Sequence, residues 1–234
     1  MEHKRLTLFA GHYGSGKTNI AVNYALHLAA EGKKVCIADL DIVNPYFRTK
    51  DSARELEAAG VHLISPQFAN SNVDLPALPA EAYRLVTDRE TYGIMDIGGD
   101  DRGAYALGRY VPGIVAEDNY RMVFVANASR PLTRTPEEAM EVMAEIEAAC
   151  NLKFTDIINN SNLGSETTVE TVLNSVAFVE KLSSLSGLPV FATTAVAEVA
   201  AELSGKIPNV LPLQLQEKYF DLPSQKPLNR PLWG

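Results

Sequence analysis

The chain alternates short apolar runs with longer stretches of helical periodicity, and this alternation restricts its possible folds more than any other feature. The runs are rich in β-branched residues and apolar throughout, which is typical of strands buried on both faces. Parallel strands need a crossover connection, so the intervening helices are expected to cover both faces of one sheet. We therefore predict an α/β fold of three layers with a mainly parallel sheet. The predicted strands are residues 6–10, 34–40, 61–65, 92–98, 122–128, 154–160, 189–194 and 209–213.

Capping residues predict two of the helices in more detail. Thr135, Pro136 and Glu138 supply an N-cap, a first-turn proline and the glutamate of a capping box. Ser165 is the expected cap of a second helix over residues 166–182. The first helix should turn one apolar face to the core, and that face is made of Ala139, Met143, Ile146 and Cys150.

Composition excludes several classes of partner. A net charge of −8 argues against nucleic acid, because phosphate contacts need clustered Lys and Arg. The chain has no run of 18 apolar residues, which argues against a membrane span. Cys36 and Cys150 lie far apart, without CxxC spacing or neighbouring histidines, so we expect buried free thiols in a reducing cytosol. The predicted location is therefore cytoplasmic.

The segment Gly-His-Tyr-Gly-Ser-Gly-Lys-Thr, residues 11–18, joins the first predicted strand to the first helical stretch. Glycines at this spacing let successive backbone N–H groups converge on an anion at a helix N-terminus. Lys17 is expected to reach the β- and γ-phosphates, and the Thr18 hydroxyl to ligate Mg²⁺. The predicted nucleotide contacts here are Gly11, His12, Tyr13, Gly14, Ser15, Gly16, Lys17, Thr18 and Asn19.

Acidic residues end two further predicted strands. Asp39 and Asp41 follow one of them, and Asp96 precedes Gly98 and Gly99 in the other. The carboxyl ends of parallel strands share one edge of a sheet, and Mg²⁺ prefers oxygen ligands. Carboxylates beside a phosphate loop therefore favour metal binding or the positioning of water.

These residues resemble the MinD/ParA branch of the P-loop ATPases, whose phosphate loop is followed by a strand ending in Asp-x-Asp and by a later Asp with small residues. The resemblance covers about residues 5 to 215 and implies a P-loop NTPase fold that uses ATP and Mg²⁺. It places Asp39 near the metal, together with Thr18 and Asp96, and makes Lys17 and Asp41 catalytic, with Asp41 orienting the attacking water. Gly98 and Gly99 fall on the turn that senses the γ-phosphate.

Two residues of the loop depart from the family pattern. The family's lysine that reaches across a dimer to the partner's nucleotide falls on His12, and a usual glycine falls on Tyr13. An imidazole is shorter than a lysine side chain, so two interpretations remain open for His12: contact with phosphate, or packing within the loop. A nucleotide-dependent homodimer is an expectation of the resemblance.

The segment 158–164 lies at the end of a later predicted strand, where P-loop switches read the base. A GTPase would carry Asn-Lys-x-Asp, and this segment has no carboxylate. Asn159 and Asn160 carry amides that can both donate and accept, as the adenine edge requires. The sequence therefore favours ATP over GTP.

We thus expect residues 1–215 to form a P-loop nucleotide-binding domain, with the proline-rich residues 216–234 as an extended strap of the same domain. The leading hypothesis is a slow ATPase that switches a protein partner, with metalloenzyme or corrinoid-protein maturation as one candidate role. Residues 41–51 occupy the place of a switch loop.

Two alternatives stay open. One is a small-molecule kinase or ATP-dependent ligase with a substrate pocket over residues 41–48 and 99–110, where arginines can clamp a carboxylate. The other is a nucleotide-gated binding module with little hydrolysis.

Overall fold

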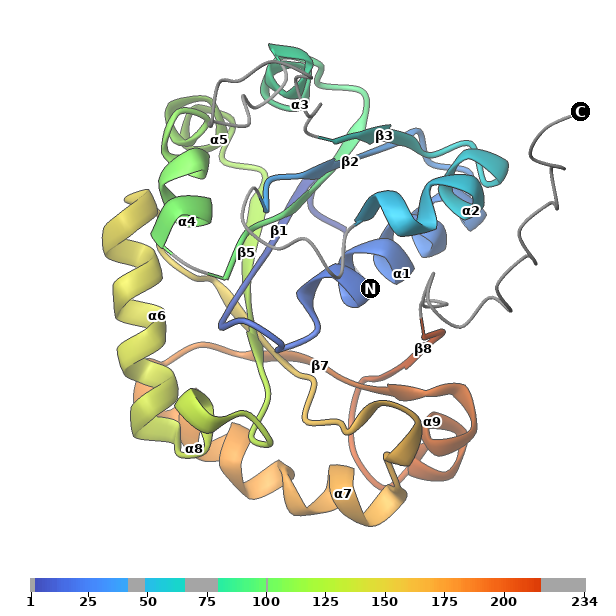
Figure 1. Cartoon of the computed structure of the whole chain (residues 1–234), viewed down its shortest axis with the longest axis vertical. Helices are drawn as coiled ribbons and strands as arrows, with labels where there is room; N and C mark the ends of the chain where they lie inside the picture. Colours follow the sequence, from blue (N-terminus) through green and yellow to red (C-terminus); the bar gives the residue numbers. More distant parts are fainter. Residues whose placement is uncertain (1–2, 42–48, 66–79, 100, 216–234) are drawn as a thin grey trace, which may run out of the picture.

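Figure 1 shows the computed structural model of the chain, which describes residues 3–41, 49–65, 80–99 and 101–215. Within these ranges eight strands form one sheet in the order β3-β2-β4-β1-β5-β6-β7-β8, and all neighbouring pairs are parallel. The predicted sheet is confirmed, and each predicted strand has its counterpart. The strands are β1 (Leu6–Ala10), β2 (Val35–Asp39), β3 (His62–Ile64), β4 (Tyr92–Asp96), β5 (Tyr120–Ala126), β6 (Asp156–Asn159), β7 (Val190–Val196) and β8 (Val210–Leu213).

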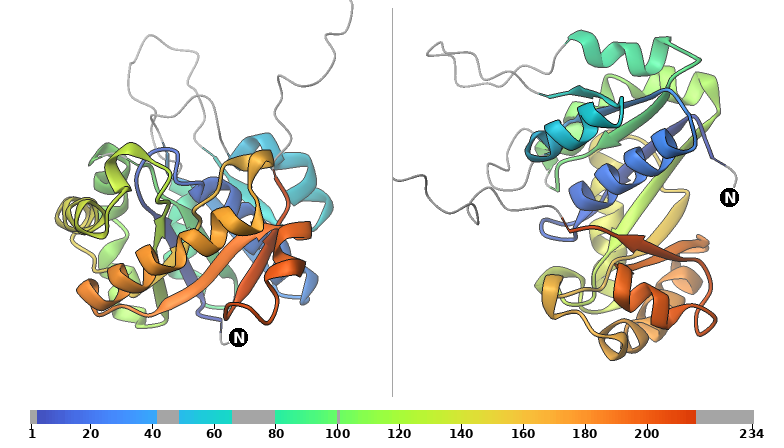
Figure 2. Two further views of the ribbon diagram at one scale, coloured as in Figure 1. Left: turned by 90° about the horizontal axis from the view of Figure 1, so that it is seen from below. Right: turned by 90° about the vertical axis from the view of Figure 1, so that its right-hand side faces the viewer.

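Helices cover both faces of the sheet, as predicted. In Figure 1, α4, α5, α6 and α8 lie to the left of the sheet, and α1, α2 and α9 lie to its right. The right-hand view of Figure 2 looks onto α1, with α2 above it and β8 and α9 below. The helices are α1 (Lys17–Ala30), α2 (Ala53–Ala58), α3 (Arg84–Thr87), α4 (Asp101–Gly108), α5 (Val111–Glu117), α6 (Pro136–Cys150), α7 (Val169–Asn174), α8 (Val176–Ser186) and α9 (Ala197–Leu203).

The apolar core is divided by the sheet into two main clusters. One joins alternate side chains of β1, β2, β4 and β5 to α4, α5, α6 and α8, and the other joins the opposite faces of those strands to α1. Leu8 and Phe9 show this alternation, because they are neighbours in β1, fully buried, and belong to different clusters. Burial on both faces explains why these strands read as continuous apolar runs.

The helix α6 begins and packs as its sequence predicts. The Thr135 hydroxyl accepts a hydrogen bond from the Glu138 backbone N–H at 3.1 Å, and the Glu138 carboxylate accepts from the Thr135 N–H at 3.0 Å. The predicted apolar face, which includes Met143 and Cys150, is buried. Local capping chemistry therefore decides where this helix starts.

The expected cap at Ser165 is wrong. Ser165 lies in a short 3₁₀ turn (Gly164–Glu166), and α7 is capped instead by Thr168, whose hydroxyl accepts from the Thr171 N–H at 3.1 Å. The predicted single helix is two helices that meet at Ser175. In α7, Val172 is buried, whereas the next residue, Leu173, is exposed.

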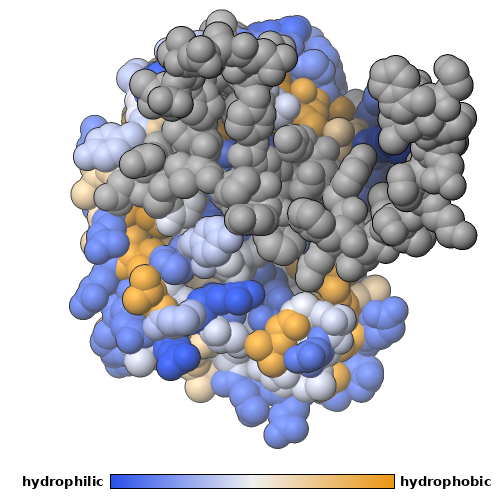
Figure 3. Space-filling view, in the orientation of Figure 1, coloured by the Kyte–Doolittle hydropathy of each residue, from blue (hydrophilic) through white to orange (hydrophobic). Residues whose placement is uncertain are grey.

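Cys36 and Cys150 are both buried free thiols, as predicted. No helix among the described residues is both long and apolar enough to cross a bilayer. Where described residues form the face seen in Figure 1, hydrophilic surface surrounds separate apolar patches (Figure 3). The predicted strap, residues 216–234, lies outside the described residues.

Candidate nucleotide-binding site

The strand order brings the predicted acidic residues to the phosphate loop. β4 lies between β2 and β1, so the ends of β4 and then β2 lie to one side of the loop that follows β1. Asp39 and Asp96, distant in sequence, are register partners at the last positions of these two strands. The predicted meeting of acids and loop at one sheet edge is thus present.

Three glycines give the phosphate loop its path between β1 and α1. Gly11, Gly14 and Gly16 have φ angles of 152°, 76° and 93°, which side chains strongly disfavour. Gly16 is the N-cap of α1 and contributes no side-chain cap, so the first N–H groups of a fourteen-residue helix face the loop. The helix dipole adds positive potential at this end.

Neighbouring strands approach the loop too closely for side chains. A Cβ on Gly11 would lie 2.7 Å from the backbone oxygen of Val125 in β5. A Cβ on Gly99, just after β4, would lie 2.7 Å from the backbone nitrogen of Tyr13 and 3.0 Å from Lys17 Nζ. The Gly98–Gly99 turn therefore packs directly against the phosphate loop.

The loop residues occupy different environments. Lys17 is buried, and its Nζ donates to the His12 backbone oxygen at 3.3 Å. The His12 ring is half-buried, and its Nδ1 lies 3.0 Å from the Tyr13 backbone oxygen. Tyr13 projects outward with 53% of its surface exposed. The imidazole of His12 thus packs within its own loop, while Lys17 faces the acidic residues.

Three carboxylates are buried beside Lys17. Asp39, Asp41 and Asp96 are 2%, 8% and 1% exposed, and the Asp41 backbone N–H donates to Asp39 Oδ1 at 3.0 Å. The Thr49 hydroxyl, from the 3₁₀ turn Thr49–Ser52, donates to Asp96 Oδ2 at 3.2 Å. These carboxylates lie close together, and Lys17 acts on Asp96 among them, so this density of acidic oxygens suits a site that is completed by a cation.

The pKa of Asp96 is raised to about 6. Burial is the main cause, and the nearby Asp41 carboxylate raises the pKa further. Lys17 and the hydroxyls of Thr18 and Thr49 lower it, without offsetting the burial. An ionised Asp96 is therefore costly until a cation binds beside it.

Several polar atoms at this edge are buried without a hydrogen-bond partner among the described residues. They are Ser15 Oγ, Asp96 Oδ1, Asn127 Nδ2 and Arg130 Nε. Buried polar atoms in proteins are normally paired, so a cluster of unpaired donors and acceptors points to a polar ligand. A phosphate group suits the donors, and Mg²⁺ suits the carboxylate oxygen, so the residues present fit a Mg²⁺-nucleotide.

The sequence interpretation missed Asn127 and Arg130. Asn127 follows the last residue of β5, at the same sheet edge as the acidic residues. A polar residue at the carboxyl end of a strand could by itself have indicated a ligand site. The Arg130 Nε lies 3.5 Å from the position that a Cβ on Gly14 would take. Its guanidinium therefore lies against the phosphate loop, a position that no local pattern indicates.

Asn159 and Asn160 are placed at the end of β6, but their amides are used inside the protein. Asn159 Nδ2 donates to Ser175 Oγ at 2.8 Å, and Asn160 Nδ2 donates to the Ser15 backbone oxygen at 2.6 Å. Asn160 Oδ1 accepts from the Thr194 hydroxyl at 2.6 Å. Asn160 thus holds the phosphate loop against β6 and β7, and neither side chain is presented to a base.

Other predicted residues differ in their surroundings. Asn19 is half-buried in the first turn of α1, where its backbone oxygen accepts from Asn23 Nδ2 at 2.8 Å. Arg109, at the end of the alternative substrate segment, is exposed. Residues 42–48, most of the predicted switch loop, are outside the described ranges.

Comparison with solved structures shows the fold. The chain is similar to the signal recognition particle receptor FtsY from Elizabethkingia anophelis (TM-score 0.54, 20% identity, 83% of this chain and 58% of that chain). It is also similar to FtsY from Thermotoga maritima (TM-score 0.50, 18% identity, 83% of this chain and 62% of that chain). A third similar structure is the signal recognition particle 54 kDa protein from Aeropyrum pernix K1 in complex with GDP (TM-score 0.51, 19% identity, 82% of this chain and 41% of that chain).

The chain thus spans about three-fifths or less of those structures' length. No protein-family model and no curated protein matches the sequence. Identities of this size show the fold alone, and that fold is the predicted P-loop NTPase fold.

Replacing Asp96 by Asn should stabilise the nucleotide-free protein. Because the folded-state pKa is raised from 3.8 to about 6, the ionised carboxylate destabilises the fold at neutral pH by about 3 kcal/mol. The cost is absent below the unfolded pKa and complete above the folded one. Urea denaturation without Mg²⁺ should therefore show equal stabilities near pH 4 and a more stable variant at pH 7; equal stabilities at pH 7 would contradict this account of the site.

Proposed function

We propose that the chain is a Mg²⁺-dependent nucleoside triphosphatase that acts as a switch on a protein partner. The observation that carries the proposal is the convergence, at one sheet edge, of a phosphate loop, buried carboxylates and polar atoms without partners. Such an arrangement can position phosphates and stabilise transferred charge, which is most of what phosphoryl transfer requires.

The roles of the residues follow from their chemistry. Lys17 and the N–H groups at the start of α1 bind the β- and γ-phosphates. The Thr18 hydroxyl, Asp39 and Asp96 would hold Mg²⁺ directly or through water, and the bound ion neutralises phosphate charge. Asp41 orients the attacking water, and Gly99, packed against Tyr13 and Lys17 Nζ, lets the turn after β4 respond to the γ-phosphate.

ATP is the nucleotide we propose. The segment after β6 has no carboxylate for the two guanine N–H groups, although the similar structure from Aeropyrum pernix holds GDP. The amides of Asn159 and Asn160 no longer support adenine recognition, since both donate within the protein. The absent carboxylate is thus the remaining support for ATP.

Exposed apolar side chains support a protein partner at the same edge. Tyr13 follows β1, Leu132 lies in the 3₁₀ turn Pro131–Thr133 after β5, and Leu163 follows β6, each at least half exposed. Because β1, β5 and β6 are neighbouring strands, these side chains follow strand ends at one edge of the sheet, where they offer apolar contacts to a partner. The MinD/ParA resemblance makes a second copy of the chain the first partner to test, with an unidentified client protein as the target of the switch.

The switch predicts a change of mass with nucleotide state. The full chain should be monomeric with ADP and dimeric with a non-hydrolysable ATP analogue and Mg²⁺, because the γ-phosphate alone distinguishes the two. Light scattering coupled to size exclusion measures this, with the matching GTP analogue as the comparison. Tight nucleotide binding without any change of mass would favour a metabolite kinase or a passive binding module. ATP turnover that depends on an added metabolite would then identify the kinase.

Asp41 should affect catalysis more than binding. Replacing it by Asn keeps the shape of the side chain but removes the charge that orients the attacking water, and such losses lower turnover by about a hundredfold or more. Single-turnover ATP hydrolysis and nucleotide affinity, measured together, separate the two effects. Glu180→Gln, on the exposed side of α8, is the control; an unchanged rate in the Asp41 variant would argue against the proposed role.

Arg130 is proposed to stabilise negative charge on the transferred phosphate from within the same chain. We expect Arg130→Ala to lower the hydrolysis rate by about a hundredfold, as for other donors to developing charge. ATP affinity and thermal stability should change little. Arg134→Ala, an exposed arginine in the same segment, is the matched control. A variant that loses stability but not turnover would reduce Arg130 to a packing residue.

A further inference from the structure

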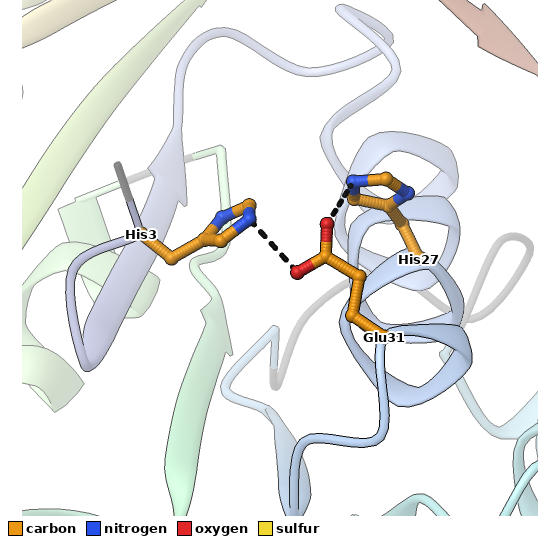
Figure 4. Close-up of side chains that lie close together, drawn as sticks. All are labelled: His3, His27 and Glu31. Atoms are coloured by element: carbon orange, nitrogen blue, oxygen red, sulfur yellow. Dashed lines mark ion pairs between the residues drawn. The ribbon is translucent and has the colours of Figure 1, made fainter. Parts of the chain in front are cut away.

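A second cluster of ligand-type side chains lies at the other end of α1. His3, from the segment before β1, His27, in the last turns of α1, and Glu31, directly after it, point toward one another (Figure 4). Glu31 Oε2 lies 3.1 Å from His3 Nε2, and Glu31 Oε1 lies 3.2 Å from His27 Nε2. One carboxylate therefore faces two imidazole rings.

The spacing of these atoms is close to that of a metal site. The three candidate ligand atoms all lie within 4.8 Å of one another. Ligands around a tetrahedral Zn²⁺ with bonds near 2.0 Å are about 3.3 Å apart. Each imidazole nitrogen already lies at about this distance from one Glu31 oxygen, Oε2 for His3 and Oε1 for His27. Binding through a single carboxylate oxygen therefore requires one ring to shift toward the oxygen that faces the other ring. The His27 side chain is 57% exposed, so it has room to move.

His3 has a second partner that orients its ring. Its Nδ1 lies 3.0 Å from the Tyr24 hydroxyl, and Tyr24 is buried against Phe9 and Phe191. When Nδ1 donates its proton to that hydroxyl, Nε2 carries the lone pair that a metal requires. Such outer partners of histidine ligands are typical of built metal sites.

We propose that His3, His27 and Glu31 form a binding site for a divalent transition-metal ion of the zinc class. Two imidazole nitrogens and one carboxylate suit Zn²⁺ and disfavour Mg²⁺ and Ca²⁺, which prefer oxygen ligands. The three protein ligands leave a further coordination position for water or another donor. The proposal does not depend on the proposed nucleotide function.

The site has a mechanical consequence for the fold. α1 begins at Lys17 beside the phosphate loop and is about 20 Å long, so the metal ligands lie at its opposite end. A bound ion ties His3, shortly before β1, to the end of α1, and these two elements carry the phosphate loop between them. Metal binding should therefore stabilise the folded protein through mass action.

The test is metal titration of the full chain without nucleotide. Calorimetry with Zn²⁺ should find one equivalent of tight binding, and Co²⁺ should develop visible ligand-field absorption at the same site. His3→Ala and His27→Ala should each weaken Zn²⁺ binding at least tenfold. Tyr24→Phe should weaken it about tenfold, because it removes only the outer partner of His3. Thermal stability of each metal-free variant shows that the loss is not unfolding.

The chain offers a matched control. His62 Nε2 lies 2.8 Å from Glu81 Oε1, an exposed histidine–carboxylate pair like those of the cluster, but with a single imidazole. His62→Ala should leave Zn²⁺ affinity unchanged, and excess Mg²⁺ should not displace Zn²⁺. The proposal is overturned if His62→Ala weakens binding as much as His27→Ala, or if Zn²⁺ binds the wild-type chain only weakly and at many sites.

Discussion

Close contact between the phosphate loop and the strands on either side of it holds the whole site together. The backbone oxygen of Val125 in β5 leaves no room for a side chain on Gly11. The backbone nitrogen of Tyr13 likewise leaves no room for one on Gly99. Asn160 adds a hydrogen bond from β6 to the Ser15 carbonyl. Since the loop is held from several strands, a displacement of the turn after β4 must affect Tyr13 and Lys17, which both lie against Gly99.

The electrostatics of this edge are organised around an excess of buried acid. Asp39, Asp41 and Asp96 are buried at one sheet edge, and burial outweighs the nearby Lys17 in setting the protonation of Asp96. Stability and function oppose each other at this edge, because buried carboxylates that suit a cation destabilise the folded protein when no cation is bound. The nearby polar atoms that lack hydrogen-bond partners are likewise explained by a ligand that would pair with them.

The helix α1 links the two candidate sites without requiring them to act together. Its first turn follows the phosphate loop, and its last turns carry His27 and lead to Glu31. Between them, Tyr24 packs edge-on against Phe9 of β1 with ring centroids 5.7 Å apart, and its hydroxyl reaches His3. The packing of α1 on β1 therefore sets the geometry at both ends.

Local sequence determined the elements and the phosphate loop. Uninterrupted apolar runs predict strands because burial on both faces requires them, and the Thr135–Glu138 capping box sets the start of α6 because its partners are three residues apart. Between residues 165 and 171 several hydroxyl side chains could serve as the N-cap of the helix. Thr168 is the cap, because its hydroxyl accepts a hydrogen bond from the Thr171 N–H, and the expected Ser165 is not.

Only the tertiary structure decided which side chains remain available at the site. Asn159 and Asn160 look like base readers in sequence, but their hydrogen-bond partners come from distant segments and bury them. Arg130 carries no local pattern, and His3 reaches the local pair of His27 and Glu31 only because β1 packs on α1. Periodicity and capping act between residues a few positions apart, whereas these contacts depend on the order and register of the strands.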